Sequence, residues 1–224
     1  IECYKSTLQL NPKDIKAYIN QGIAYQYIDD FKSAFESYKL ALKINPESAE
    51  GHNNLGYAFK ELGDIRSSIE CYRKALEISP SYSEARWNLA SVQLLSNDYE
   101  DGWRNYEWRF KKENPTVPHA LPCIPQWRGE ELASTEKLLV VTEQGLGDTL
   151  QFMRYIPYLQ KLGIDVSFCA QTKLHHLIRA SGIHPNPLTP EEGNQIFTGK
   201  WTPLLSLPKY LGVMPKNPII KEPY

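Results

Sequence analysis

The chain has 224 residues and a nearly balanced charge, with 25 lysines and arginines against 26 aspartates and glutamates. It contains no basic run, which argues against nucleic acid as a partner, and no apolar run approaches the ~20 residues that a membrane span requires. The four cysteines are far apart and form no CxxC pair, which favours reduced thiols in a cytoplasmic protein over a disulfide framework. Because Ile1 falls inside a repeat, we expect a fragment of a longer chain.

The first half of the chain repeats itself every 34 residues. Prolines, tyrosines and two registers of small residues keep this step: Pro12, Pro46 and Pro80; Tyr4, Tyr38, Tyr72 and Tyr106; Gly22, Gly56 and Ala90; Ala17, Gly51 and Ala85. The period resembles that of the tetratricopeptide repeat, in which each unit is a pair of antiparallel helices. It predicts an α-helical superhelix with whole units over 15–48, 49–82 and 83–116, preceded by the second helix of a truncated unit.

Each repeated position has a physical role in this prediction. The small residues let the two helices of one unit cross closely, and the tyrosines fill the space between neighbouring units. The turns inside the units fall at Asp29-Asp30, Gly63-Asp64 and Asn97-Asp98. The last unit departs from the pattern at Gln93 and Arg109, as expected of a terminal unit.

A further register is made of amides. Asn20, Asn54 and Asn88 follow the same 34-residue step on the predicted first helices, which line the concave groove in the tetratricopeptide family. An amide both donates and accepts hydrogen bonds, so a row of them suits the main chain of an extended peptide. The row resembles the asparagine ladder of O-linked N-acetylglucosamine transferase and implies a protein or peptide partner in the groove. The alternative is that these asparagines only cap or bridge adjacent helices.

An aromatic segment and a proline-rich segment follow the repeats. Trp103, Tyr106 and Phe110 share one helical face, which we expect to pack against the next domain. Four prolines over 115–125 exclude regular helix and central strand and predict a stiff extended linker. We therefore divide the chain into repeats over 1–113, a linker over 114–135 and an α/β region over 136–224, and we expect Trp127 to anchor the linker onto the α/β layer.

The last region alternates strand and helix patterns. Residues 137–142 read as a buried parallel strand, 148–162 as a helix kinked by Pro157, and 165–169 as a second strand. A second helix is expected over 173–180, a loop over 185–193, a third strand within 195–205 and a short helix over 207–211. This order predicts a parallel sheet with right-handed crossovers.

The stretch EQGLGDTLQF at 143–152 resembles the first strand, loop and helix of a bacterial glycosyltransferase group. Its members carry tetratricopeptide repeats before a heptosyltransferase-like region, and residues 102–109, 127–130 and 203–208 resemble the same group. The resemblance implies a two-lobed, Rossmann-like transferase that is inverting and metal-independent. Residues 136–224 would be its first lobe, so a nucleotide-sugar donor is expected only with a second lobe after Tyr224, and no tightly bound cofactor or metal is expected.

The same resemblance implies a role for the aspartate of the loop. Asp148 matches the proposed general base on the acceptor hydroxyl, and the loop residues expected to meet substrate are Glu143, Gln144, Gly145, Gly147, Thr149 and Gln151. The alternative is that Asp148 is the N-cap of the helix, with Gln151 completing a capping box. A dinucleotide site is not expected, because Leu150 stands where the third glycine of that motif belongs.

These patterns together favour a protein-binding repeat scaffold attached to a partial glycosyltransferase-like domain. The parent protein is expected to transfer a sugar to an acceptor that the repeats choose, and the fragment alone is expected to be inactive. The alternatives are a non-catalytic assembly module with a relic α/β domain, and an α/β region that only covers the apolar end of the superhelix.

Overall fold

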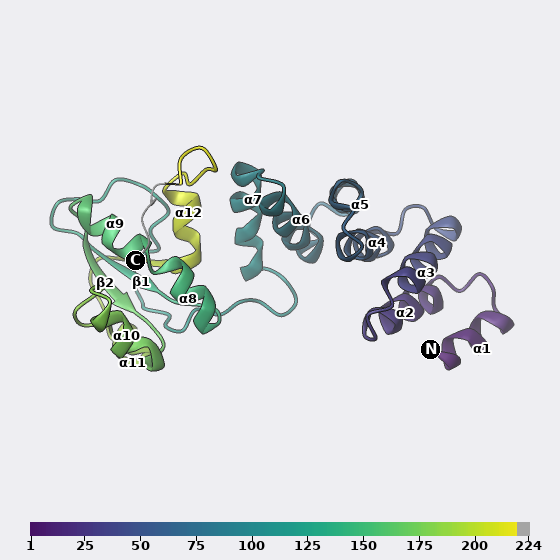
Figure 1. Cartoon of the computed structure of the whole chain (residues 1–224), viewed down its shortest axis with the longest axis horizontal. Coiled ribbons are helices and arrows are strands. Elements are labelled where there is room, and N and C mark those ends of the chain that lie inside the picture. Colours follow the sequence, from purple (N-terminus) through teal and green to yellow (C-terminus); the bar gives the residue numbers. More distant parts are fainter. Residues whose placement is uncertain (219–224) are drawn as a thin grey trace. The chain divides into compact units, whose positions relative to one another are not determined.

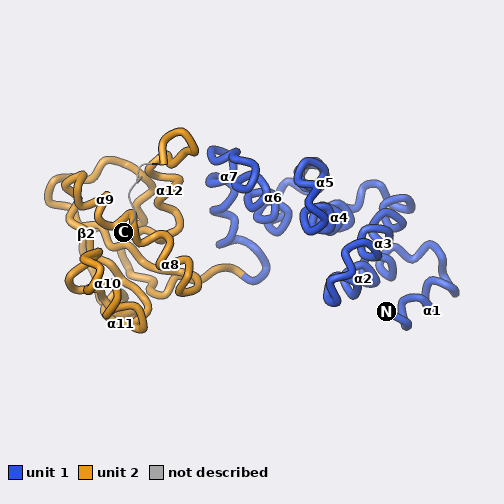
Figure 2. The backbone as a smooth tube through the Cα atoms, viewed as in Figure 1, with its two compact units in different colours: residues 1–114 blue, residues 115–224 orange. Residues whose placement is uncertain are grey.

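The computed structural model describes residues 1–218 of the chain. The chain divides into two compact units, Ile1–Asn114 and Pro115–Tyr224 (Figure 2). None of the described helices combines the length and the apolarity that crossing a bilayer demands. All four cysteines carry free thiols, and burial raises the pKa of Cys71 to about 11 and that of Cys169 to about 12.

The first unit is built from paired helices, as the 34-residue period predicts (Figure 1). The single helix α1 (Glu2–Leu10) precedes three pairs. These are α2 (Ile15–Gln26) with α3 (Phe31–Ile44), α4 (Ala49–Glu61) with α5 (Ile65–Ile78), and α6 (Ser83–Leu95) with α7 (Tyr99–Tyr106), which the 3₁₀ turn η1 (Glu107–Phe110) continues. The predicted helical repeat architecture is confirmed.

Local chemistry begins and ends these helices. The side chains of Asp14, Asp30, Ser48 and Asp64 each accept a hydrogen bond from the backbone N–H three residues ahead, which satisfies a donor that the first helical turn leaves open. The turns inside the units place Asp29, Gly63 and Asn97 at positive φ, of 57°, 86° and 63°. Aspartate, asparagine and glycine are the residues that tolerate this conformation, so the turn recurs with the repeat.

Each of the first two complete repeats is closed by a tyrosine that lies on a glycine. A Cβ atom added at Gly56 would stand 2.9 Å from the ring of Tyr72, and one at Gly22 would meet Tyr38 in the same way. Both tyrosines are 0% exposed. The cluster around Tyr38 includes Leu55 and Ala58 of the next first helix, so this ring contacts both its own unit and the neighbouring one.

The third repeat replaces that glycine by Ala90, and its tyrosine is only partly buried. Tyr106 lies against Trp87 of α6, with ring centroids 4.8 Å apart, and against Trp103 at 5.7 Å. The aromatic face that we expected to meet the next domain therefore makes these contacts inside the first unit. Arg109 occupies the place of the small residues Ala41 and Ala75 and is buried beside Phe110.

The second unit contains a three-stranded parallel sheet, which confirms the predicted strands. Its strands are β1 (Lys137–Val141), β2 (Asp165–Cys169) and β3 (Lys200–Pro203), in the order β2-β1-β3. Val141 at the end of β1 pairs with Cys169 and with Pro203, so the three strands end together. The intervening helices are α8 (Leu146–Phe152), α9 (Tyr155–Lys161), η2 (Thr172–Leu174), α10 (His175–Ala180), α11 (Pro190–Asn194), η3 (Leu204–Ser206) and α12 (Leu207–Tyr210).

Two predictions for this unit were wrong. The single kinked helix over 148–162 is two helices, which part at Met153 and Arg154. Pro157 accounts for the break. Its ring clashes with the carbonyl of Met153, four residues earlier, and its nitrogen has no hydrogen to donate to that carbonyl. The region 185–193 is not only loop. Leu188 forms a parallel bridge with Cys169, and Thr189 and Glu192 form a capping box that starts α11.

The proline-rich segment differs from the linker expected over 114–135. His119 donates its N–H to the carbonyl of Thr142 at 2.8 Å, and Trp127 donates its N–H to the carbonyl of Trp201 at 2.7 Å. Gln126 forms a parallel bridge with Trp201, and the indole of Trp127 lies against Tyr210 at 5.5 Å between ring centroids. From His119 onward the segment is therefore bonded along the second unit.

Replacing Gly56 by alanine tests the crossing of α4 and α5. We expect Gly56→Ala to lower the free energy of unfolding of the first unit by about 1–3 kcal/mol, because the added methyl overlaps the ring of Tyr72. Urea unfolding followed by circular dichroism measures this. The control is Gly147→Ala, where nothing lies within 4 Å and φ is not positive, and which should be neutral or stabilising. Equal effects of the two variants would contradict the account.

Candidate functional site

The first candidate site is the row of first helices. α2 contacts α4, and α4 contacts α6, so the first helices of successive repeats are neighbours. Asn20 is exposed on α2, whereas Asn54 on α4 and Asn88 on α6 are half-buried. The three predicted amides therefore lie on consecutive helices, in different degrees of exposure.

A chain of amide hydrogen bonds joins two of these asparagines. The Nδ2 atom of Asn88 donates to Oδ1 of Asn53 at 3.0 Å, and Nδ2 of Asn53 donates to Oδ1 of Asn54 at 3.1 Å. Asn53 is 6% exposed and was missed by the sequence analysis, because its 34-residue counterparts are Ile19 and Trp87 and carry no amide. Asn20 takes no part in the network of described residues.

This network leaves two polar groups unused. Within residues 1–218, neither Nδ2 of Asn54 nor Oδ1 of Asn88 makes a hydrogen bond. The two hydrogen bonds made through Asn53 fix the orientations of the other two amides. The unused donor, Nδ2 of Asn54, lies on α4, and the unused acceptor, Oδ1 of Asn88, lies on α6. The asparagines bridge adjacent helices, as one interpretation held, and they also keep the complementary pair of groups that peptide main chain requires.

The second candidate site is the loop after β1. Gly145 is the N-cap of α8, and Asp148 is the third residue of that helix, so the expectation that Asp148 is itself the N-cap was wrong. Its carboxylate turns back, and Oδ2 accepts the N–H of Gly145 at 3.1 Å. Since glycine has no side chain, this is only the returning half of a capping box.

Buried side chains connect this loop to its neighbours. The hydroxyl of Thr149, a residue that is 1% exposed, donates to Oε1 of Gln171 at 2.9 Å, and Nε2 of Gln171 donates to the carbonyl of Gln144 at 2.8 Å. Gln171 follows β2 and carries no motif that sequence reasoning would have found. These bonds join the loop after β1 to the loop after β2.

A second connection runs from β1 to β3. Glu143 is 4% exposed, and its Oε1 accepts the N–H of Leu205 at 3.0 Å. Two of the predicted loop residues, Glu143 and Thr149, therefore point into the unit and support the loop from inside. Gly145, Gly147 and Gln151 are exposed, and Gln144 and Asp148 are half-exposed. The exposed surface of the loop consists of this second set together with Leu146.

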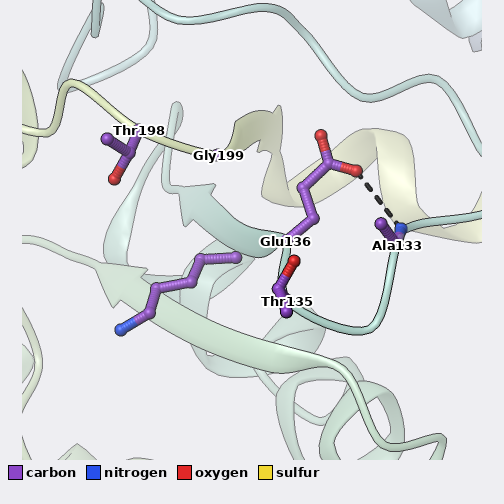
Figure 3. Close-up of a pocket in the computed structure, with 6 residues that line it drawn as sticks. Ala133, Thr135, Glu136, Thr198 and Gly199 are labelled. Atoms are coloured by element: carbon purple, nitrogen blue, oxygen red, sulfur yellow. Dashed lines mark hydrogen bonds between the residues drawn. The ribbon is translucent and has the colours of Figure 1, made fainter.

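A hollow of about 420 Å³ lies at the opposite end of the sheet, where the strands begin (Figure 3). Glu136 accepts the N–H of Ala133 there at 3.3 Å, and Lys200 pairs with Glu130 at 2.9 Å and with Glu136 at 3.6 Å. The hydrogen bond from Lys200 lowers the pKa of Glu130 to about 2. Because ligands of parallel sheets bind at the carboxyl ends of strands, and these charges are already paired, this hollow is not the candidate site.

The donor atoms of a metal site are not gathered in the part of the chain that the structure describes. No group of three or more His, Cys, Asp or Glu side chains is arranged to hold an ion there. Two buried histidines of the second unit contact backbone carbonyls through their rings. Nε2 of His175 lies 3.0 Å from the carbonyl oxygen of Ala170, and Nε2 of His184 lies 3.0 Å from that of Val166.

Two family models match the first unit. One is described as tetratricopeptide repeat and matches residues 49–82, and the other is described as TPR repeat and matches residues 29–63. The chain contains tetratricopeptide repeats. Protein FlbA of Caulobacter vibrioides is 33% identical over 78 residues, which are 34% of this chain and 13% of FlbA. This chain therefore spans only a small part of the length of FlbA.

Solved structures resemble the chain over about half of its length. The crystal structure of MamA superimposes with a TM-score of 0.45 at 23% identity and covers 49% of this chain and 64% of MamA. The complex of the TPR2B domain of yeast Sti1 with pHsp70 gives a TM-score of 0.42 at 23% identity, with 44% of this chain and 79% of that chain covered.

Removing the carboxylate of Glu143 tests the connection between β1 and β3. We expect Glu143→Ala to lower the free energy of unfolding of the second unit by about 1–3 kcal/mol, because the N–H of Leu205 loses its buried acceptor. Chemical denaturation followed by circular dichroism provides the measurement. Glu143→Gln keeps an acceptor oxygen and should cost less, so an equal loss in both variants would argue against this role.

Proposed function

We propose that the repeats are a protein-binding scaffold that holds an extended peptide segment across α4 and α6. The observation that carries this proposal is the pair of oriented, unused amide groups, Nδ2 of Asn54 and Oδ1 of Asn88. A peptide main chain offers a carbonyl to the first and an N–H to the second. Because neither amide contacts the side chains of the peptide, the pair fixes the path of the segment and leaves sequence preference to other residues.

Truncating both amides tests the scaffold. Peptides selected on the intact chain from a random 12-residue library are the probes, and their Kd is measured by calorimetry. We expect Asn54→Ala with Asn88→Ala to weaken binding about tenfold, since two hydrogen bonds are lost at about 0.5–1.5 kcal/mol each. The control is Asn45→Ala, in the turn between α3 and α4, whose side chain serves only a local N–H. Unchanged affinity in the double variant would refute the amide pair.

We further propose that the second unit is the first, Rossmann-like lobe of a heptosyltransferase-like glycosyltransferase. Strand order supports this. Leu188 bridges the outer edge of β2 and Gln126 that of β3, both in the parallel sense, so the lines of chain run Leu188, β2, β1, β3, Gln126. Counted from β1 onward, the first four lines have the order 3-2-1-4, in which ligands bind where the order reverses, beside the end of the first strand. Asp148 and the exposed glycine loop stand after that strand.

The state of Asp148 supports a proton-transfer role. Its Oδ2 is held by Gly145, while Oδ1 makes no hydrogen bond within the described residues. A carboxylate that is positioned by one oxygen and open at the other can accept the proton of a sugar-acceptor hydroxyl. The donor would be a nucleotide-sugar held by a second lobe, the repeats would choose the acceptor, and residues 1–224 alone would be inactive. The alternative is a non-catalytic assembly module whose α/β unit is a relic.

Asp148→Asn separates these two alternatives. The amide oxygen of asparagine still accepts the N–H of Gly145, so the loop keeps its shape while the base is lost. In the longest natural chain that contains this sequence, we expect kcat for sugar transfer to fall at least about 100-fold. Asp165→Asn, at the exposed start of β2, is the control and should leave kcat unchanged. Unchanged turnover in Asp148→Asn would exclude the base role, and absence of any transfer would favour the assembly module.

A further inference from the structure

The last repeat carries a group of cations on two indole rings, here called the cation–indole cluster: Arg86, Trp87, Trp108, Lys111 and Lys112. The guanidinium of Arg86 and the ammonium of Lys111 each lie 4.6 Å from the centroid of the Trp108 ring. The ammonium of Lys112 lies 5.2 Å from the centroid of the Trp87 ring. The two cations on Trp108 are therefore no more than about 9 Å apart.

The three cations of the cluster lack ion-pair partners in the described part of the chain, although Glu84 and Glu113 lie nearby and are joined by the N–H of Glu113 and the carboxylate of Glu84 at 2.6 Å. Among residues 1–218, none of its three cations pairs with a carboxylate, whereas Arg104 of the same repeat pairs with Asp101 at 2.7 Å and Glu100 at 3.2 Å. Arg86 donates one hydrogen bond to the carbonyl of Pro80 at 3.0 Å, and its buried Nε has no partner in this part of the chain. Three cations gathered on two neighbouring indoles raise the local positive potential and attract an anion.

The repeat fold does not require the part of this cluster that lies after α7. At the 34-residue step, the counterparts of Trp108 are Leu40 and Lys74, and those of Lys112 are Ile44 and Ile78. Lys111 has a lysine counterpart in Lys43, which is exposed on α3 and makes no contact with an aromatic ring among the described residues. The first two repeats fold with other residues at the positions of Trp108 and Lys112, so the pairing of helices in a repeat does not need these two side chains. Arg86 and Trp87 also serve the fold, because Arg86 repeats the bond of His52 to the carbonyl of Pro46, and Trp87 packs against Tyr106.

We propose that the cation–indole cluster binds an acidic segment of the partner protein, a proposal that rests on the scaffold function above and names the partner's chemistry. Asn88 bonds to Asn53 of α4 and Trp87 packs against Tyr106 of α7, so a segment that bonds to Asn88 and continues toward the C-terminal end of the unit comes to the cluster. Aspartate or glutamate side chains supply the missing negative charge. Single-stranded nucleic acid fits less well, because it binds by stacking bases on open aromatic faces, and here cations lie over both indoles.

The test uses the intact chain and two probes, a 12-residue peptide with four consecutive glutamates and its twin with four glutamines. Tryptophan fluorescence reports binding, since the cluster contains two indoles. The acidic peptide should bind at least tenfold tighter than its twin, and this preference should shrink as salt is raised. Lys111→Gln should lower the affinity for the acidic peptide several-fold, and Lys111→Gln with Arg86→Gln should abolish the preference.

Lys43→Gln is the matched control, because it removes the same charge at the same repeat position away from the cluster, and it should change nothing. Arg86→Lys keeps the charge and should retain most of the preference, which separates loss of charge from misfolding. Equal binding of the two peptides, or equal effects of Lys111→Gln and Lys43→Gln, would overturn the proposal. So would tighter binding of a 12-nucleotide oligouridine than of the acidic peptide. None of these outcomes touches the result with Asn54 and Asn88, so the scaffold function is judged separately.

Discussion

The contact between a tyrosine and a glycine is the constraint on which the repeat unit depends. At Gly56 the absence of a side chain makes room for the ring of Tyr72, which lets α4 and α5 approach closely. The equivalent ring of Tyr38 also contacts the next first helix, so one residue both closes a repeat and joins it to its neighbour. The stability of the unit is then approximately the sum of the stabilities of its repeats and of the contacts between neighbouring repeats. In the third repeat Ala90 replaces the glycine, and Tyr106 packs against Trp87 instead.

The second unit obeys a different constraint, the common end point of its parallel strands. Because β1, β2 and β3 end in register, the loops that follow them meet at one edge and can be joined by short side chains. Glu143 makes one such connection and Thr149 with Gln171 makes another. These interior bonds hold the loop that presents Asp148 from inside the unit. The polar residues of this loop thus divide into those that support it and those that face outward.

Helix α6 brings together two kinds of recognition in the first unit. In the proposed binding mode, Asn88 offers an acceptor to peptide main chain, and the neighbouring Trp87 belongs to the cation–indole cluster. Main-chain hydrogen bonds fix where a segment lies but read little of its sequence, whereas charge distinguishes one segment from another. A single helix can therefore supply both the path and the preference of a partner, at the repeat that departs most from the common pattern.

The sequence by itself determined the helical repeats and the parallel strands. Both follow from local properties, a 34-residue period in which each unit makes the same contacts and short apolar runs between turns. It also held the signals for the break before Pro157 and for the capping box at Thr189, although the expectation of one helix and one loop overlooked them. The tertiary structure alone decided the partners of polar groups: that Asn53 joins Asn54 to Asn88, that Glu143 faces Leu205, and that Arg86 and Lys111 share one indole. Such pairs join residues distant in the chain, and their geometry is set by how the helices and strands pack, which no local pattern records.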